Sequence, residues 1–313
     1  MTNINQNFAI EISGLKKIYN HKKPNAFEAL KGINLNIPKK SIFGLLGANG
    51  AGKSTLINII AGLVLKTEGN VKVWDNDIDI NERNAKLSIG VVPQELILDP
   101  FFTPRETLEY QSGYYGVPKN ENCVEEILET VGLSDKADAY ARSLSGGMRR
   151  RLMIGKAMVH RPPILILDEP TAGVDVALRQ SLWKEVRKLN EAGVTIILTT
   201  HYLEEAEALC NSVAMLRSGK VVASDTTKNL LKKFSSKNLK LRLDLKLNKQ
   251  LPSNVKRIPH EITGNDYVFE LKKIADIAKI TESLNAAKIE ILDLQAVDTD
   301  LENVFLKLTG KEK

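Results

Sequence analysis

The octapeptide GANGAGKS at residues 47–54 constrains the fold of this chain more than any other stretch. It matches the phosphate-loop pattern G-x-x-x-x-G-K-[ST] in full, between an apolar run that predicts a strand and a pattern that predicts a helix. The glycines of such a loop let the backbone wrap around phosphate oxygens, the lysine reaches the β- and γ-phosphates, and the serine coordinates Mg²⁺. The motif predicts binding of a nucleoside triphosphate through Gly47, Ala48, Asn49, Gly50, Ala51, Gly52, Lys53, Ser54 and Thr55.

Two further apolar runs have the same design as the run before the phosphate loop. ILILDEPT (164–171) and VTIILTTH (194–201) are short, β-branched or leucine-rich, and end in polar residues. Helical patterns separate the three runs, which predicts an α/β fold with a parallel sheet covered on both faces. Ligands of such sheets bind beyond the carboxyl ends of the strands. We therefore expect the three polar clusters to meet at one edge of the sheet.

Three residues at this edge are candidates for chemistry. Asp168 ends a strand at a position where a carboxylate can hold the Mg²⁺ shell. Glu169 follows it and is placed to polarise an attacking water, which as general-base assistance contributes about 10²–10⁴-fold. A lone histidine is more often structural, but His201 ends a strand at the same edge as Asp168. We therefore interpret His201 as part of the site.

Patterns elsewhere divide the chain into further parts. The first forty residues alternate and turn like a short antiparallel sheet, and the stretch from Gln94 to Pro162 is mostly helical. After about Phe234, alternating strands and two helical patterns indicate a small separate α+β domain, joined by the lysine- and serine-rich residues 232–237. The predicted boundaries are 1–234 for a nucleotide-binding domain, about 95–162 for a helical subdomain within it, and 235–313 for a C-terminal α+β accessory domain.

The composition is that of an ordinary globular protein, with 43% hydrophobic and 26% charged residues among 313. The net charge of +6 is spread along the chain and only 5% of residues are aromatic, so nucleic acid is not indicated, and a membrane surface or an acidic partner fits equally well. Cys123 and Cys210 lack a CxxC spacing, which favours free thiols in a reducing cytosol. No signal peptide is predicted, and no run approaches the ~18 apolar residues that cross a bilayer. Any membrane role is therefore expected to depend on a partner.

The stretch SLSGGMRRR at residues 143–151 presents a second anion site. Backbone N–H groups at a helix N-terminus bind phosphate readily, and Ser145, Gly146 and Gly147 open a helix in the helical insert, away from the strand-end edge. The motif has no phosphate of its own within one chain, so we interpret it as a site that each subunit offers to the nucleotide held by a second copy. The three arginines fit either a solvated helix face or a contact with a membrane partner.

The ordered motifs of the chain resemble those of the ATPase subunit of an ATP-binding cassette (ABC) transporter. They are Tyr19, GANGAGKST, VVPQ ending at Gln94, LSGGM, ILILDEPT, AGVD ending at Asp175, and TTH ending at His201. The resemblance covers roughly residues 8–230 and implies a phosphate-loop ATPase core with an antiparallel β subdomain and a helical insert. It also implies a homodimer that sandwiches two ATP molecules, each closed by the partner's LSGG motif.

The same resemblance implies a role for each matching residue. Lys53, Glu169 and His201 would be catalytic, with Glu169 as the base and His201 holding the γ-phosphate and the attacking water. Tyr19 would stack on adenine, and Asp175 would communicate across the dimer. The Mg²⁺ ligands that it implies are Ser54, Gln94 and Asp168, with Gln94 also sensing the γ-phosphate.

Further segments resemble the exporter branch that works with ABC-2-type membrane proteins. They are GGMRRR, SGYYGV, TAGVDVALRQSLW, LTTHYLEEAEALC and the tail LENVFLKLTG. This resemblance implies a peripheral protein on the cytoplasmic face of the inner (plasma) membrane, bound to an integral membrane permease subunit. The rival interpretation is a soluble ABC ATPase that acts in translation or DNA repair. The single cassette, without a long charged linker, zinc module or long coiled coil, argues against that rival.

Two expectations stay open at this level. Phe101 and Phe102 lie beside a proline-bounded turn, and their rings belong either on the surface that meets the permease or inside the helical subdomain. The C-terminal domain is either a dimer-stabilising appendage, which we favour, or a regulatory ligand site.

Overall fold

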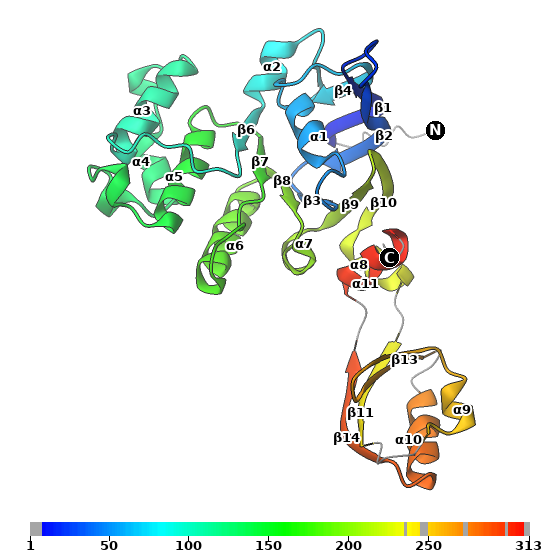
Figure 1. The fold of residues 1–313 in the computed structure, drawn as a ribbon. Helices are drawn as coiled ribbons and strands as arrows, with labels where there is room; N and C mark the ends of the chain where they lie inside the picture. The colour runs from blue at the N-terminus through cyan, green and yellow to red at the C-terminus, as the bar shows by residue number, and fades with distance from the viewer. Residues whose placement is uncertain (1–7, 235–236, 245–249, 272–274, 298–299, 310–313) are drawn as a thin grey trace, which may run out of the picture. The chain divides into compact units, whose positions relative to one another are not determined.

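The computed structural model describes the chain except for residues 1–7, 235–236, 245–249, 272–274, 298–299 and 310–313. The chain divides into two compact units, Met1–Thr227 and Lys228–Lys313, so the division falls before the predicted boundary at 234–235. The predicted joining segment at 232–237 lies partly outside the described residues. Figure 1 follows the chain through both units.

The larger unit is built on a mostly parallel sheet with the strand order β10-β9-β3-β8-β7-β6, in which only β10 is antiparallel to its neighbour. The three predicted strands, β3, β8 and β7, are adjacent and parallel, and their apolar side chains are buried. The motifs did not reveal β6, β9 or β10. The strands span Ile42–Leu46 (β3), Ile89–Val92 (β6), Ile164–Asp168 (β7), Thr195–Thr200 (β8), Ser212–Arg217 (β9) and Lys220–Thr226 (β10).

A second sheet, with the order β2-β1-β4-β5, is antiparallel throughout. Its first two strands confirm the antiparallel pattern predicted for the first forty residues, whereas β4 and β5 come from later in the chain. Buried residues of this sheet, of α1 and of the central sheet form one hydrophobic cluster, which fixes the phosphate-loop helix between them. The elements are β1 (Phe8–Tyr19), β2 (Phe27–Pro38), β4 (Glu68–Val73), β5 (Asn76–Asp77) and α1 (Lys53–Ile60).

The helical subdomain lies between β6 and β7 in the chain and has its own hydrophobic core. Thr103 begins α3 with a capping box to Glu106, and Pro104 occupies the first helical turn, where its missing N–H is not needed. Gly155 lets α5 pack closely, because a Cβ there would lie 2.8 Å from Ile127. The elements are α3 (Pro104–Tyr114), α4 (Val124–Thr130), α5 (Gly146–Met158) and the 3₁₀ turns Lys119–Glu121, Ser134–Lys136 and Ala141–Ser143. Figure 1 shows the three helices grouped beside β6.

Of the remaining helices of the larger unit, α6 and α7 connect strands of the central sheet, whereas α2 leads from β5 of the second sheet to β6. Asp175 begins α6, because its carboxylate accepts a hydrogen bond from the Leu178 N–H at 2.8 Å. The α7 helix begins two residues after His201, which follows the last residue of β8. The helices are α2 (Glu82–Leu87), α6 (Val176–Glu191) and α7 (Leu203–Leu209).

The smaller unit is an α+β domain whose antiparallel sheet has the order β12-β13-β11-β14. Leucines of β11 and aromatic residues of β13 alternate into a core that α9 and α10 cover. The strands and helices predicted after Phe234 are present within the described residues, and α8, β12 and α9 are additions. The elements are α8 (Thr227–Phe234), β11 (Lys237–Asp244), α9 (Ser253–Lys256), β12 (His260–Thr263), β13 (Asp266–Leu271), α10 (Asp276–Ala286), β14 (Glu290–Val297) and α11 (Leu301–Thr309).

Candidate functional site

The phosphate loop connects β3 to α1 and bends through glycines with positive φ. Gly50 has φ 79° and Gly52 has φ 108°, conformations that side-chain-bearing residues rarely adopt. No heavy atom lies within 4 Å of a Cβ built on Gly50, so the loop backbone there is open to a ligand. Lys53, the first residue of α1, points into the loop, and its ammonium donates to the carbonyls of Gly47 (2.7 Å) and Ala48 (3.3 Å).

Lys53 is the cation of this site and it is buried. Burial lowers the pKa of Lys53 from its ordinary value, and the negative charges of Glu169 and Asp168 partly oppose that shift. Both carboxylates predicted from the ILILDEPT strand therefore act electrostatically on the lysine. An anion bound in the loop would supply the negative charge that compensates the buried ammonium.

Asp168 and Glu169 lie at the end of β7, where the parallel pairing with β8 sets their positions. Asp168 pairs with Thr199, whose hydroxyl donates to the aspartate carboxylate. The Glu169 N–H donates to the Thr199 carbonyl at 3.1 Å and to its hydroxyl at 3.0 Å. Glu169 has φ 45°, a left-handed conformation that costs of order 1–3 kcal/mol in a residue other than glycine. Neighbouring backbone thus holds the glutamate in a conformation that it would not adopt by itself.

Two further predicted residues contact the Glu169 carboxylate. The Gln94 side chain donates from Nε2 to Oε2 at 3.2 Å, and His201 Nδ1 lies 3.3 Å from Oε1. Only 13% of the Glu169 side chain is exposed, whereas 41% of the His201 side chain is exposed beside the Tyr202 ring. Three predicted residues from the ends of β6, β7 and β8 therefore meet at one point, as expected for the carboxyl edge of a parallel sheet.

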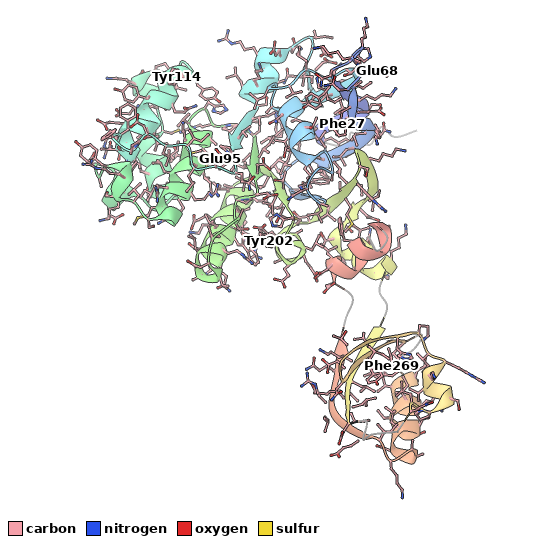
Figure 2. All side chains as sticks on the ribbon, in the orientation of Figure 1. Phe27, Glu68, Glu95, Tyr114, Tyr202 and Phe269 are labelled. Carbon is pink, nitrogen blue, oxygen red and sulfur yellow. The ribbon has the colours of Figure 1, made fainter. Side chains whose placement is uncertain are left out.

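A pocket of about 450 Å³ joins the phosphate loop to these residues. It is lined by Phe27, Ala29, Asn49, Gly50, Gly52, Lys53, Ser54, Thr55, Gln94 and Glu169. Phe27 was not among the predicted residues, and its ring is 61% exposed at the start of β2 (Figure 2). Tyr19, the predicted adenine platform, pairs with Phe27 across the β-ladder but does not line this pocket. No motif marks Phe27, because its place at the pocket follows from the pairing of β1 with β2.

The geometry suits magnesium bound together with phosphate. Mg²⁺ prefers oxygen ligands and is usually held by one or two carboxylates and a hydroxyl, with phosphate oxygens and water completing its shell. Asp168 and Glu169 both act electrostatically on Lys53, and Ser54 and Gln94 line the same pocket. Within the described residues, no group of three or more histidine, cysteine, aspartate or glutamate side chains could hold a metal by itself. The oxygen donors of this site fit Mg²⁺ that phosphate oxygens and water also coordinate.

The second glycine motif lies at the N-terminus of α5. The Ser145 hydroxyl accepts a hydrogen bond from the Met148 N–H at 3.3 Å and so caps the helix. Ser145 and Gly146 are exposed, and a Cβ on Gly146 would meet no atom within 4 Å. Gly147 packs against α6, where a Cβ would lie 2.4 Å from Leu178. None of the three motif residues lines the phosphate-loop pocket of the same chain.

Asp175 also lies outside that pocket. Its carboxylate caps α6 three residues before Leu178, the side chain against which Gly147 packs. The structure therefore places Asp175 near the second glycine motif of its own chain. Its predicted role across the dimer stays a prediction.

The arginines of GGMRRR do not form a single solvated face. Arg150 is 4% exposed and donates to the backbone carbonyls of Pro93 and Gln94. Arg151 donates to the carbonyls of Val131 at 2.7 Å and Gly132 at 2.9 Å, within the helical subdomain. The expectation of a solvated helix face is thus wrong for Arg150, because the end of β6 covers it.

Phe101 and Phe102 are exposed rather than part of the core of the helical subdomain. The Phe101 ring is 66% exposed, with the Arg142 guanidinium 5.8 Å from its centroid, and Phe102 stacks on Tyr110 at 4.9 Å. Tyr114, on α3 as well, is also exposed (Figure 2). Contiguous exposed aromatic side chains mark surfaces that meet partners.

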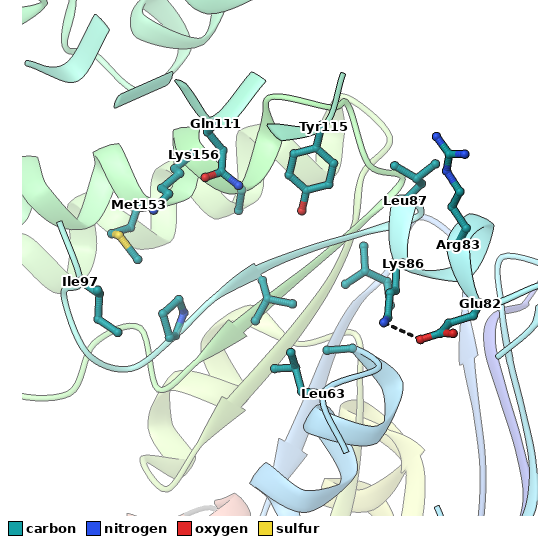
Figure 3. A pocket seen from close by; sticks show the side chains of 15 residues that line it. Leu63, Glu82, Arg83, Lys86, Leu87, Ile97, Gln111, Tyr115, Met153 and Lys156 are labelled. Atoms are coloured by element: carbon teal, nitrogen blue, oxygen red, sulfur yellow. Dashed lines mark hydrogen bonds and ion pairs between the residues drawn. The ribbon is translucent and has the colours of Figure 1, made fainter. Parts of the chain in front are cut away.

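A groove of about 780 Å³ lies where α2, β6, α3 and α5 approach one another (Figure 3). Leu63 and Ile97 contribute exposed apolar side chains to it. Arg83, Lys86 and Lys156 contribute positive charge, and Lys86 also forms an ion pair with a glutamate of α2 (Figure 3).

Among the residues that the structure describes, no helix has the length and apolarity to cross a membrane.

Comparisons with known proteins agree with this geometry. A family model described as ABC transporter matches residues 30–172. The linearmycin resistance ATP-binding protein LnrL of Bacillus subtilis (strain 168) is 36% identical over 311 residues, which cover 96% of this chain and 98% of the relative. The daunorubicin/doxorubicin resistance ATP-binding protein DrrA of Streptomyces peucetius is 34% identical, covering 96% and 92%. The Nod factor export ATP-binding protein I of Bradyrhizobium diazoefficiens is 34% identical and covers 98% of each chain.

Solved structures show the same fold for the larger unit. The dimeric ABC transporter cassette MJ0796 is 28% identical, with a TM-score of 0.61, and covers 69% of this chain and 98% of that one. The cassette cbiO1 from Clostridium perfringens is 27% identical, with a TM-score of 0.64, and covers 72% and 94%.

Proposed function

Because the chain belongs to the ABC transporter family as an ATP-binding subunit with ATPase activity, we propose that it powers export through a separate membrane subunit. Relatives that align over nearly the whole chain are named for antibiotic resistance and for Nod factor export, which supports export as the direction of transport. The motif variants GGMRRR and LENVFLKLTG support an ABC-2-type permease as the membrane subunit. The protein would then act as a peripheral subunit on the cytoplasmic face of the inner membrane.

One observation carries the proposed mechanism: the N-terminus of α5 is exposed and contributes nothing to the pocket of its own chain. Helix N-termini favour anions, and Gly146 leaves the backbone there accessible. A second copy can bring this terminus to the γ-phosphate held by the phosphate loop. The structure of the cassette MJ0796 is dimeric, which supports pairing of two copies. ATP would then be hydrolysed between two copies of the chain.

The residues at the sheet edge divide the chemistry of hydrolysis. Lys53 binds the β- and γ-phosphates, where the triphosphate compensates its buried charge. Glu169 accepts the proton of the attacking water, and His201 orients that water and the γ-phosphate. The Gln94 amide holds the Glu169 carboxylate in place through its hydrogen bond. Mg²⁺, held by Ser54, Gln94 and Asp168, would neutralise phosphate charge as it develops.

The paired site can be tested in a protein that binds ATP without turning it over. The Glu169→Gln protein with ATP and Mg²⁺ is expected to elute as a dimer in gel filtration, because closure persists when hydrolysis cannot reopen it. Adding Ser145→Arg places a bulky cation at the exposed terminus and should abolish the dimer while ATP binding per chain is kept. Ser134→Arg, at another exposed serine of the helical subdomain, is the matched control. A Ser145→Arg protein that still dimerises would argue against the cross-subunit role.

The groove shown in Figure 3 supports a docking place for the membrane subunit. Its apolar side chains and its excess of cations suit an amphipathic cytoplasmic segment that carries an acidic residue. Ile97 belongs to the groove, and Phe101 follows it closely in the chain. We expect the exposed aromatic rings to extend this contact.

Membrane attachment is tested with membrane vesicles prepared from cells that make the chain. Phe101→Glu with Phe102→Glu is expected to release the chain from vesicles, because both rings would have to be buried against the partner, while the ATPase activity of the purified chain survives. Ile80→Glu, at an exposed apolar residue outside the groove, is the control and should leave the chain bound. Wild-type chain that does not sediment with these vesicles would overturn the membrane role and favour a soluble ABC ATPase.

A further inference from the structure

Arg150 is a buried cation in the first turns of α5, the helix that begins with the second glycine motif. Its guanidinium Nη1 donates to two backbone carbonyls, that of Pro93 at 3.1 Å and that of Gln94 at 2.9 Å. Its Nε is buried and has no hydrogen-bond partner among the described residues. Burying a charge is costly unless hydrogen bonds compensate it, and the two hydrogen bonds of Nη1 compensate this charge only in part.

The two carbonyls belong to the segment that carries the Gln94 side chain. Gln94 is exposed, and its amide reaches the Glu169 carboxylate at 3.2 Å. Without Arg150, both carbonyls would lose their side-chain donor at the position where β6 has ended and the sheet ladder no longer holds the backbone. A small shift of this backbone would move the amide away from the glutamate.

The rest of α5 is also attached to β6. A Cβ on Gly90 would lie 2.2 Å from the Ala157 carbonyl oxygen, so strand and helix backbones are in direct contact there. His160, just after the helix, hydrogen-bonds through Nε2 to the Ile89 carbonyl at 3.1 Å. Helix α5 is therefore attached to β6 near its C-terminus and, through Arg150, to the two residues that follow β6 near its N-terminus.

We propose that Arg150 is a positioning residue for ATP hydrolysis, which holds the Gln94 amide on Glu169 and links it to the second glycine motif. A contact of Ser145 with the nucleotide of the partner copy would then change the position of the Gln94 amide relative to Glu169 of the same chain. The inference rests on the roles proposed above for Gln94 and Glu169. It adds a connection between the two anion sites of one chain, which runs through Arg150.

Arg151, the next residue, is a matched control. Its Nη1 also donates to two backbone carbonyls, those of Val131 and Gly132, but these lie inside the helical subdomain. Arg151→Met removes the same kind of interaction from the same helix without touching the segment of Gln94. A general loss of helix packing would affect both arginine variants alike.

The test is a double-mutant cycle on ATP hydrolysis by the purified full chain. Gln94→Ala, Arg150→Met and the pair are compared, with thermal unfolding recorded for each protein. We expect Arg150→Met to lower kcat about 10–100-fold, the range for a displaced catalytic group, with KM for ATP changed less than about 3-fold. In the Gln94→Ala background, the same substitution should change kcat by less than about 2-fold, because the group that Arg150 positions is gone. Arg151→Met should leave kcat within about 2-fold in both backgrounds.

Three results would overturn the inference or its basis. Equal falls in kcat from Arg150→Met in both backgrounds would show that the arginine acts independently of Gln94. A fall of the same size from Arg151→Met would show a packing effect. A Gln94→Ala protein with wild-type kcat would refute the role proposed for Gln94 itself, which separates that failure from a failure of the arginine. If Arg150→Met does not fold, Arg150→Lys, which keeps the charge but loses the planar guanidinium, replaces it in the same cycle.

Discussion

Replacing Glu169 by glutamine distinguishes a role of this residue in ATP hydrolysis from a role in shaping the pocket. Glutamine has the size of glutamate and keeps an oxygen that can accept the Gln94 hydrogen bond of 3.2 Å, so the pocket should keep its shape. What it loses is the basic oxygen and the negative charge, one of the two charges that raise the pKa of Lys53 against the effect of burial. The Lys53 pKa should therefore fall further in this variant, until the triphosphate is bound.

The expected effect on turnover is large and the effect on binding is small. Removing a general base costs about 10²–10⁴-fold in rate, or about 2.7–5.4 kcal/mol in the activation free energy. The dissociation constant for ATP should change less than about 3-fold, because the loop and Lys53 are kept and one charge that repels phosphate is removed. Phosphate release gives kcat, and isothermal titration with ATP and Mg²⁺ gives the dissociation constant.

The control for this variant is Glu191→Gln, at an exposed glutamate that ends α6. It makes the same change of charge away from the sheet edge and should leave both constants unaltered. Glu169→Gln with kcat within about 3-fold of wild type would refute the assignment of Glu169 as the base. Loss of ATP binding together with turnover would show instead that the glutamate builds the pocket.

Three further outcomes follow from the structure. Phe27 lines the pocket and Tyr19 does not. Phe27→Ala is therefore expected to weaken ATP binding by about 0.5–1.5 kcal/mol, the contribution of a ring stack, whereas Tyr19→Ala should leave the titrated affinity closer to wild type. A larger loss from Tyr19→Ala would instead support the predicted role of Tyr19 as the adenine platform. Glu205→Ala removes the acceptor shared by a buried threonine hydroxyl and an indole N–H, so urea unfolding should show a loss of about 1–3 kcal/mol, and an unchanged midpoint would contradict the role of this carboxylate. Hydrogen bonding from the Arg242 guanidinium lowers the pKa of Asp266 from 3.8 to about 2. A lowered carboxyl pKa stabilises the folded state at pH values above the unfolded-state pKa, and this stabilisation is lost as the pH falls from 3.8 towards 2. An NMR titration should therefore find the Asp266 pKa raised by Arg242→Gln, and an unshifted pKa would refute the pairing.

Local sequence determines much of the sheet edge that carries the candidate site. A phosphate loop needs its glycines and lysine within eight residues, so its strand, turn and helix can be predicted without knowledge of the rest of the chain. Asp168, Glu169 and His201 could be predicted for a related reason, because parallel strands place their carboxyl ends at the same edge. Gln94 and Asp175 were identified only by the family resemblance, since no local pattern marks them.

Alternation and periodicity also predict the smaller unit. The alternating leucines of β11 and the amphipathic pattern of α10 indicate which faces are buried, and the structure buries those faces. Short edge strands could not be predicted in this way. The four-residue strands β6 and β12 are too short for periodicity to separate them from loop.

Tertiary structure alone decides which polar and aromatic side chains meet. Three consecutive arginines look equivalent in sequence, yet Arg150 is buried against the end of β6 while Arg151 binds carbonyls of the helical subdomain. The α-helical repeat of 3.6 residues sends neighbours to different faces, and only the packing of α5 on β6 determines what each face meets. The place of Phe27 at the pocket likewise depends on tertiary structure, because the register of β1 and β2 pairs Phe27 with Tyr19. Short-range chemistry is encoded in motifs, whereas contacts between distant segments arise only when the chain has folded.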